Sequence, residues 1–361
     1  MSWMIVDMAR EILFPDRDRH AIPSLDGPWH SNQALDEADL LRTLPAPDDL
    51  AQMPAGVVVS SETRIIRVED GSVVHEATGL IGGLASDASG NLAACVEGQG
   101  VQIVAGPRSG AMLSDTDGAP LKFATAATFA PDGSLWVTEG SASYGPSAWV
   151  HDLVTKGKSG RLLRFDMLTG RASTVARDLA YPAGVCVAED GRSVCVTEAW
   201  SHTVTRYRVE GGAGTRVIRN MPGYPARLRP ASGGGFWLSL VALRTQLVDF
   251  ILGEEEYRLA MINEVDPKYW VAPTLATEDH FLEPCQGGSI KQLGIKKPWS
   301  PPRSYGLVVR LDASMDAQRS YHSRVGGHCH GTTGVLDVHG AVYVTSKGHG
   351  KVVRPLGEGP R

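Results

Sequence analysis

The feature that most constrains the fold is a short pattern that recurs along the chain. A turn containing glycine is followed by an apolar run and then by a small hydroxyl or acidic residue. Five copies are Gly90-NLAACVEG, Gly133-SLWVTEG, Gly191-RSVCVTEA, Gly234-GFWLSL and Gly340-AVYVTSKG. A second pattern occurs six times: TRIIRVEDG, VQIVAG, GRLLRFD, TVTRYRVEGG, YGLVVRLD and KVVRPLG. A recurrence at spacings of tens of residues indicates a repeat architecture.

The residue types within these patterns indicate β-hairpins. Asp132-Gly133 and Asp190-Gly191 supply residues that accept the positive φ of a tight turn. The flanking runs are rich in Val, Leu, Ile, Trp and Phe, as expected for strands buried on both faces. A four-stranded blade cannot bury both faces alone, so neighbouring blades must stack, and closing the ring protects their edges. The sequence therefore predicts an all-β fold, a six-bladed β-propeller.

The repeats set the predicted domain boundaries. Residues 45–357 form the propeller, and residues 1–44 form an N-terminal extension that either crosses the surface or closes the ring. An insertion of about residues 242–303 separates the second and third strands of the fifth blade. Its first half has apolar positions at helical spacing and Pro267 ends that pattern, so we expect a partly helical insertion. The insertion serves either as a lid or as a surface segment without a functional role.

Composition excludes several classes of partner. The chain has 361 residues, 42% hydrophobic and 21% charged, with a formal net charge of -5, which is typical of a soluble globular protein. It has no Lys/Arg cluster suited to nucleic acid and no apolar run long enough to span a membrane. The sequence carries no signal for an oligomeric state.

The N-terminus and the cysteines indicate a compartment. The first twenty residues lack the basic start and apolar core of a secretory signal. Five irregularly spaced cysteines do not suggest a disulfide framework. We therefore expect a reducing, cytoplasmic location. Cys186 and Cys195 face each other if Asp190-Gly191 is a two-residue turn, and two buried thiols are favoured over a cross-strand disulfide.

Three segments carry a family resemblance. The stretch from Ser159, SGRLLRFDMLTGRASTVARDLAYPAGVCVAEDGRSVCVTEAWSHTVTRYRVEG, resembles the centre of strictosidine synthase-like proteins. So do GYPARLRPASGGGFWLSL from Gly223 and YGLVVRLD from Tyr305. The similarity covers about residues 45–357 and extends to gluconolactonases and paraoxonases. It implies a small-molecule site in the central channel, and an ester or lactone hydrolase or a lyase, although one fold hosts many chemistries.

The resemblance also implies a divalent cation, typically calcium, which this sequence does not support. Related lactonases hold the ion with a Glu of the first blade and with Asn or Asp at the starts of later blades. The matching positions here are Thr125, Ala183, Ala226 and Arg227, and only Asp48 remains as a weak remnant. Hard cations need oxygen ligands, and Arg227 would place a fixed positive charge at the site. We therefore predict no cofactor and a lost calcium site.

Two further channel positions bear on the chemistry. The glutamate that the plant condensing enzyme uses near the start of the last blade falls on Thr333, so amine–aldehyde condensation is not supported. Arg227 suits a ligand carboxylate or phosphate through two parallel hydrogen bonds. Its structural alternative, a buried ion pair with a carboxylate of a neighbouring blade, is equally weighted.

The histidines offer a second set of candidates. His328 and His330 point to the same side if their segment is extended, and histidine transfers protons near neutral pH. A metal site would need a third ligand such as His322, His349 or His151. A loop pair without a metal is favoured over that site.

Other candidates come from a long connection and from two repeated glutamates. Tyr144, Trp149 and His151 lie in the third-blade connection, where they either roof the channel mouth or pack on the surface. Glu139 and Glu198 occupy the same repeat position, and a structural role as buried hydrogen-bond acceptors is favoured for both.

Three functional hypotheses follow. The first is a metal-independent hydrolase or lyase acting on a small, partly apolar, anionic molecule, with His330 and His328 as catalytic candidates. Its substrate-binding candidates are Arg227, Thr125, Ala183, Thr333, His151 and Tyr144. The second is a non-catalytic propeller that binds a small molecule or a protein partner. The third is a metalloenzyme that uses the histidines.

Overall fold

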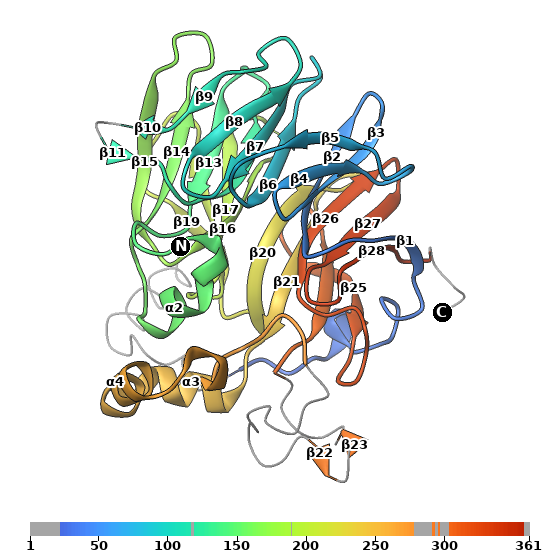
Figure 1. The fold of residues 1–361 in the computed structure, drawn as a ribbon, viewed down its shortest axis with the longest axis vertical. Helices are drawn as coiled ribbons and strands as arrows, with labels where there is room; N and C mark the ends of the chain where they lie inside the picture. The colour runs from blue at the N-terminus through green and yellow to red at the C-terminus, as the bar shows by residue number, and fades with distance from the viewer. Residues whose placement is uncertain are drawn as a thin grey trace.

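The protein is a six-bladed β-propeller of six four-stranded antiparallel sheets (Figure 1). The computed structural model describes residues 22–116, 119–188, 190–277, 291–292, 295–296 and 303–356. The predicted fold is confirmed. Within the described residues, no helix is long and apolar enough to cross a membrane.

The first three blades follow the chain in order. Blade one contains β2 (Pro47–Met53), β3 (Gly56–Ser61), β4 (Arg64–Arg67) and β5 (Val73–Glu76). Blade two contains β6 (Ile81–Ser86), β7 (Leu92–Val96), β8 (Gly100–Ala105) and β9 (Met112–Leu113). Blade three contains β12 (Ala124–Phe129), β13 (Leu135–Glu139), β14 (Gly160–Phe165) and β15 (Ala172–Leu179). A small hairpin of β10 (Asp115–Thr116) and β11 (Ala119–Pro120) precedes blade three.

The last three blades include the insertion and the ring closure. Blade four contains β16 (Pro182–Val187), β17 (Ser193–Glu198), β18 (Thr203–Arg208) and β19 (Thr215–Ile218). Blade five contains β20 (Gly223–Pro230), β21 (Phe236–Leu243), β24 (Gly306–Leu311) and β25 (Ala317–Ser323). Blade six contains β26 (Thr332–Val338), β27 (Ala341–Ser346), β28 (Lys351–Arg354) and β1 (Asp39–Thr43).

The ring is closed by the N-terminal strand. β1 pairs antiparallel with β28, with Asp39 opposite Arg354 and Thr43 opposite Lys351. The outer strand of the last blade therefore comes from the segment before residue 45. A sheet that combines both ends of the chain fastens the first blade to the last, and it covers an edge that β28 would otherwise expose.

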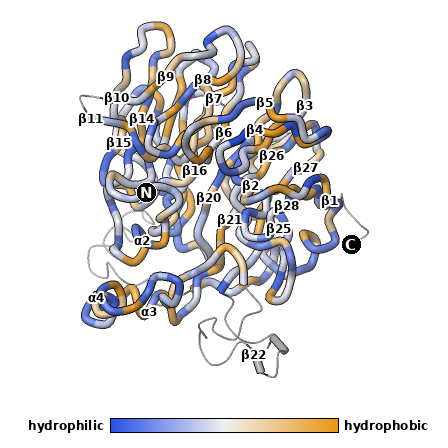
Figure 2. The backbone as a smooth tube through the Cα atoms, viewed as in Figure 1, coloured by the Kyte–Doolittle hydropathy of each residue, from blue (hydrophilic) through white to orange (hydrophobic). Residues whose placement is uncertain are grey.

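The core lies between the blades. Hydrophobic side chains of adjacent sheets pack together, as Val137 of β13 and Leu163 of β14 do with Ala93 of β7. Hydrophobic stretches follow the strands in Figure 2, while many of the turns between strands are hydrophilic. Each blade buries both faces against its neighbours, which explains why the strand sequences are continuously apolar rather than alternating.

A set of hydroxyl groups joins neighbouring blades near the axis. Each lies at the same register position of a second strand and donates to a carbonyl of the next innermost strand. The four donors and acceptors are Ser60 to Gly82 at 2.7 Å, Thr197 to Ala226 at 2.7 Å, Ser239 to Thr333 at 2.6 Å, and Thr345 to Asp48 at 2.8 Å. In three copies of the repeated sequence pattern, at Thr197, Ser239 and Thr345, the small hydroxyl residue therefore joins neighbouring blades. Thr138 of blade three instead donates to the Ala126 carbonyl of its own sheet.

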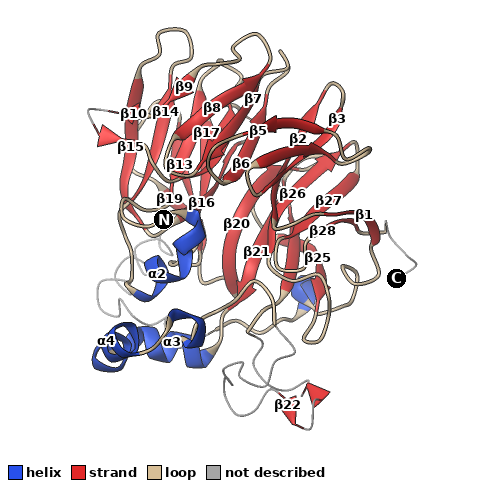
Figure 3. Ribbon diagram, in the orientation of Figure 1, coloured by secondary structure: helices blue, strands red, loops and turns tan. Residues whose placement is uncertain are grey.

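The helices lie together at one end of the propeller, apart from the short η2 (Gly27–Trp29) (Figure 3). η3 (Pro146–Ala148) and α2 (Trp149–Val154) belong to the third blade. α3 (Gln246–Gly253), α4 (Glu255–Glu264) and η4 (Pro267–Tyr269) form the helical half of the predicted insertion. The Thr245 side chain accepts a hydrogen bond from the Val248 amide, which caps the start of α3.

The two insertions share a small core of their own. Val154 of α2 packs with Ile251 of α3, Met261 of α4 and Trp270. The fifth-blade insertion is therefore joined to the third-blade connection. Residues 278–290, 293–294 and 297–302 of the predicted loop-like half lie outside the described residues, which there include the hairpin of β22 (Lys291–Gln292) and β23 (Ile295–Lys296).

Candidate functional site

A pocket on the propeller axis receives residues from all six innermost strands. These residues are Asp48 of β2, Gly82 of β6, Thr125 of β12, Ala183 of β16, Arg227 of β20 and Thr333 of β26. The cavity volume of this pocket is about 70 Å³. At roughly 10–15 Å³ for each water, that space holds a small molecule rather than a polymer segment.

Irregular pairing at the start of every innermost strand shapes this pocket. The register between the first and second strands shifts near the pocket in all six blades, for example between Pro47 and Leu50 in β2. A bulge redirects side chains that a regular strand would send to opposite faces. The neighbouring Asp48 and Asp49 consequently both bond to Arg227 of β20.

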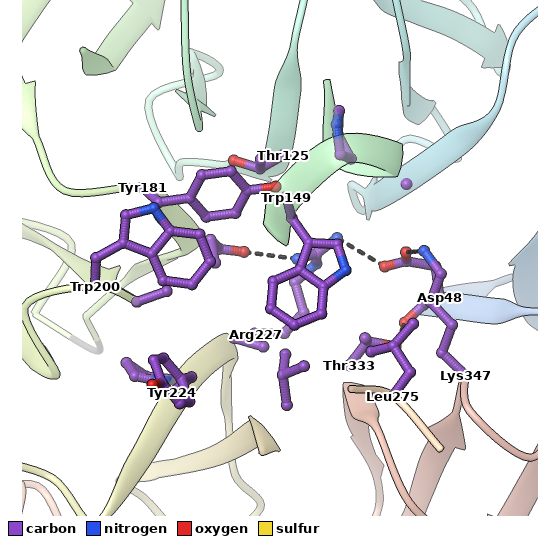
Figure 4. A pocket seen from close by; sticks show the side chains of 17 residues that line it. Asp48, Thr125, Trp149, Tyr181, Trp200, Tyr224, Arg227, Leu275, Thr333 and Lys347 are labelled. Atoms are coloured by element: carbon purple, nitrogen blue, oxygen red, sulfur yellow. Dashed lines mark hydrogen bonds and ion pairs between the residues drawn. The ribbon is translucent and has the colours of Figure 1, made fainter. Parts of the chain in front are cut away.

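One side of the pocket is aromatic. Tyr181 stacks on Trp200 with ring centroids 4.5 Å apart, and Trp200 meets Tyr224 edge to face at 6.0 Å. Trp149, the first residue of α2, stacks near Trp200 at 6.1 Å. Rings in these arrangements form an apolar wall that suits a flat ligand. Figure 4 shows Tyr181, Trp200 and Tyr224 gathered on one side of the pocket.

The opposite side is charged, as Figure 4 also shows. Arg227 Nη2 donates to Asp48 Oδ1 at 2.9 Å, and the Lys347 ammonium donates to Asp48 Oδ2. Arg227 Nη1 donates to the Ala183 carbonyl at 2.6 Å. Asp48 is thus shared between two cations from different blades. Charge-assisted hydrogen bonds of this kind hold the groups in fixed positions.

A second ion pair lies beneath the first and is fully buried. Arg229 Nη2 donates to Asp49 Oδ2 at 2.6 Å and to the Leu84 carbonyl at 2.7 Å. Asp49 Oδ2 also accepts hydrogen bonds from Arg227 Nε at 3.3 Å and from the Leu84 amide at 2.9 Å. These bonds link blades one, two and five across the axis. Buried charges are tolerated in a fold only when they are paired in this way.

The environment fixes the protonation of the pocket. Burial opposes ionisation of Asp48, but Lys347 and Arg227 prevail and lower the pKa of its carboxyl group. Burial raises the pKa of both the Tyr181 and Tyr224 hydroxyls. Asp48 is therefore an anion at neutral pH, and the two tyrosines stay protonated.

The sequence and the fold are similar to those of known proteins. Residues 126–212 match the family model of strictosidine synthase. Protein Strictosidine Synthase-like 6 of Arabidopsis thaliana is 28% identical over 135 residues, which cover 37% of this chain and 36% of that protein. The adipocyte plasma membrane-associated protein of Homo sapiens is 24% identical over 307 residues, which cover 75% of this chain and 72% of that protein. Among the first curated relatives, the chain spans 36 to 44% of their length.

The predicted resemblance to the strictosidine synthase-like propellers is confirmed. Solved structures agree on the fold. A gluconolactonase from Xanthomonas campestris has a TM-score of 0.57 at 16% identity and 88% coverage of each chain. A calcium-binding regucalcin from Agrobacterium tumefaciens has a TM-score of 0.54 at 11% identity, with 88% of this chain and 92% of that chain covered.

The residues of the axial pocket do not fit the calcium ion that the fold family implies. Asp48 already carries two cationic partners, and Asp49 is saturated by two arginines and by the amides of Leu50 and Leu84. A divalent ion would have to enter beside three positive side chains, at a strong electrostatic cost. Among the described residues, no three His, Cys, Asp or Glu side chains come together as a metal site.

The structure brings seven of the residues singled out from sequence into one pocket. They are Asp48, Thr125, Trp149, Ala183, Ala226, Arg227 and Thr333. Of the two roles considered for Arg227, its contacts match the buried ion pair. The Thr125 hydroxyl donates to the Pro182 carbonyl at 2.6 Å, and the Thr333 hydroxyl donates to the Asp48 carbonyl at 2.6 Å. Both threonines therefore fasten blades while also lining the pocket.

The predicted catalytic histidines lie outside the residues that line this pocket. His330 is buried, with Nδ1 2.8 Å from Ser304 Oγ and Nε2 2.8 Å from the Arg324 carbonyl. The side chain of His328 is 59% exposed, and its Nδ1 lies 3.5 Å from Asp36 Oδ1. These histidines do not converge with Arg227. The His330 contacts fix a loop rather than face a ligand.

The remaining predictions concern the third-blade connection and the glutamates. Tyr144 and His151 stack on each other at 5.8 Å, and His151 also contacts Trp270 at 4.8 Å. Neither lines the pocket. Glu139 accepts Arg161 Nε at 2.7 Å, and Glu198 accepts the Ala180 amide at 3.0 Å. Both glutamates make the structural bonds that the sequence favoured.

Sequence reasoning missed part of the lining, namely Lys347, Tyr181, Trp200, Tyr224 and Leu275. A signal for Lys347 did exist. It follows Thr345 by two residues, as Ala199 follows Thr197, and the second strands pair in the same register. That repeat position faces the axis, so a lysine there stood out from the small residues of blades three and four. Tyr181 and Tyr224 carried a signal too, because each precedes Pro-Ala at the start of an innermost strand, as Tyr181-Pro182-Ala183 and Tyr224-Pro225-Ala226. Trp200 carried no comparable periodic signal.

Proposed function

We propose that the protein binds a small amphipathic organic molecule in the axial pocket. One observation carries the proposal, which is the division of the pocket into two chemically different halves. Tyr181, Trp200 and Tyr224 offer an apolar wall, while Lys347 and Asp48 offer charge on the opposite side. Pockets for small ligands commonly combine an aromatic lining with a few converging polar groups.

Two further observations support this proposal. The Tyr224 hydroxyl is buried without a hydrogen-bond partner among the described residues, and such groups normally find one. A ligand or a water molecule at Tyr224 would supply it. In addition, the names of the relatives, a synthase-like protein and a gluconolactonase, refer to chemistry on small organic molecules.

A metal-independent hydrolase of esters or lactones, or a lyase, is the second candidate. The Lys347 ammonium lines the pocket, where it is placed to polarise a carbonyl oxygen. The same group would stabilise the oxyanion that forms when water attacks an ester or lactone. Lys347, rather than His330 or His328, is therefore the residue on which such an activity would depend.

The first test of binding is calorimetric titration of the full chain with a panel of one-ring and two-ring aromatic compounds. Binding in the pocket predicts that Trp200→Ala weakens the affinity about 5- to 150-fold, because the stacking of a nucleic-acid base on an aromatic side chain is worth about 1–3 kcal/mol by alanine substitution. Phe250→Ala is the matched control, because Phe250 is 56% exposed on α3 and lies outside the pocket. Equal effects of both substitutions would refute the proposed site.

Turnover of an aryl-ester and lactone panel separates the two candidates. An enzyme of the proposed kind hydrolyses members of the panel with and without chelator, and Lys347→Met removes the activity. Binding without turnover leaves the non-catalytic propeller as the function.

A further inference from the structure

We infer that the ligand is a flat aromatic or conjugated monocarboxylate whose carboxylate binds Lys347, while Arg227 serves as the structural base of the pocket. This inference rests on the proposed function, because it names the chemical class that the same pocket takes. Three steps carry it: the charge count on the axis, the saturation of the two arginines, and the position of the aromatic wall.

The charged groups on the axis do not balance. Two carboxylates, Asp48 and Asp49, face three cations, Arg227, Arg229 and Lys347. This cluster therefore carries one positive charge in excess when all five groups are ionised. A partly enclosed site of low polarity strengthens the attraction between that excess charge and an anion.

The arginines have little capacity left for a ligand. Arg227 donates hydrogen bonds from Nε to Asp49, from Nη1 to the Ala183 carbonyl and from Nη2 to Asp48. Arg229 uses Nη2 on Asp49 and on the Leu84 carbonyl. The side chains of Arg227 and Arg229 are only 7% and 9% exposed. Binding a ligand through either arginine would break bonds that hold the blades together.

Lys347 is the cation that remains accessible. Its side chain is 25% exposed and lines the pocket. Among the described residues, Asp48 is the hydrogen-bond partner of its ammonium group, which has three N–H donors in total. The remaining donors suit a carboxylate oxygen of the ligand. The bond to Asp48 holds the ammonium group in place and so fixes the direction in which these donors point.

The aromatic wall determines the shape of the rest of the ligand. With the carboxylate at Lys347, the body of the ligand extends across the pocket toward Trp200 and Tyr181. A planar group there gains stacking contacts. A cationic ligand is disfavoured by Arg227 and Lys347. Asp152 accepts the Trp200 indole N–H at 2.7 Å and lies outside the pocket lining.

The test is competitive titration with phenylacetate, phenylacetamide and phenethylamine, which share one ring and differ in charge. We expect the acid to bind about tenfold or more tighter than the amide, because hydrogen bonds to charged groups are the stronger ones. The amine should bind most weakly, and added salt should narrow the difference between acid and amide.

Lys347→Met isolates the inferred contact. Acid and amide should then bind equally, with the amide affinity unchanged. Lys268→Met is the matched control, because Lys268 is a surface lysine outside the pocket, and it should preserve the preference for the acid. Equal binding of acid and amide to the unmodified protein would overturn this inference alone and leave the proposed function standing. Absence of binding by all three compounds would overturn both.

Discussion

The Arg227 guanidinium bonds the Asp48 carboxylate at 2.9 Å across the axis of the propeller, although the two residues are 179 positions apart in the chain. The first and fifth blades are thus tied together at the base of the pocket. The bond belongs to a network with Asp49, Arg229 and Lys347.

Breaking this network should cost much of the stability of the fold. Arg227→Met leaves Asp48 with Lys347 alone and removes one of two arginines from Asp49. Removing one partner of a buried ion pair typically costs about 3–5 kcal/mol. Urea denaturation should therefore show a large drop in midpoint. Arg354→Met, which breaks the exposed pair with Asp39, should leave the midpoint nearly unchanged. A similar loss in both variants would contradict the structural role of Arg227.

His322 should make stability depend on pH. Burial lowers the pKa of this histidine to about 4, and His30 and Arg324 add to the effect. The unfolded chain takes up a proton near pH 6.5, whereas the folded chain resists it. The stabilisation is therefore complete above about pH 6.5 and falls toward about pH 4 by up to about 1.4 kcal/mol per pH unit.

The matching measurement is the unfolding free energy from pH 4 to 7. His322→Gln should make the dependence in that window clearly shallower, and the slope that remains should come from the buried His202, whose pKa is lowered to about 3. His328→Gln, which changes an exposed side chain, should retain the slope of the unmodified protein. An unchanged slope in His322→Gln would disprove the assignment.

The inter-blade hydroxyls should contribute to stability without shaping the pocket chemistry. Ser239→Ala removes the donor to the Thr333 carbonyl and leaves that buried acceptor with one fewer bond. The loss should be about 1–3 kcal/mol in the unfolding free energy, with no change in protonation of the pocket. Ser314→Ala, in an exposed turn, provides the control. Thermal unfolding of the two variants side by side measures the difference.

The buried cysteines should resist thiol reagents while the protein is folded. Cys186 and Cys195 lie directly opposite each other in the register of blade four, and both thiols are free. Burial raises the pKa of Cys95 and of Cys329 to about 12. Alkylation followed by peptide mass spectrometry should label these four only after denaturation, since the thiolate is the reactive form. Rapid labelling in the native state would contradict their burial.

The fold was accessible from sequence because the repeats encode it locally. Asp132-Gly133 and Asp190-Gly191 specify hairpin turns, and six similar strand pairs leave few alternatives to a closed ring. The axial position of Asp48, Thr125, Ala183 and Arg227 followed from the same logic, because each opens an innermost strand. Positions defined by a repeat can be transferred from blade to blade.

The rest of the site depends on contacts that no local pattern contains. Trp149 was a candidate for the channel mouth, but neither its segment nor the turn after β17 that holds Trp200 encodes the contact between the two rings. Their meeting is a product of tertiary packing. His330 precedes Thr333 by three residues, yet it is not among the residues that line the pocket. The intervening chain turns, and the His330 imidazole bonds to Ser304 and the Arg324 carbonyl instead.

The most direct test of this account is calorimetric titration of the chelator-treated, full-length protein with Ca²⁺, together with its unfolding temperature with and without chelator. Because Arg227, Arg229 and Lys347 already neutralise the axial carboxylates, we predict no stoichiometric binding at millimolar Ca²⁺ and no change in unfolding temperature. One tightly bound Ca²⁺ per chain, with a chelator-dependent loss of stability, would contradict the claim that the protein's own cations occupy the axis.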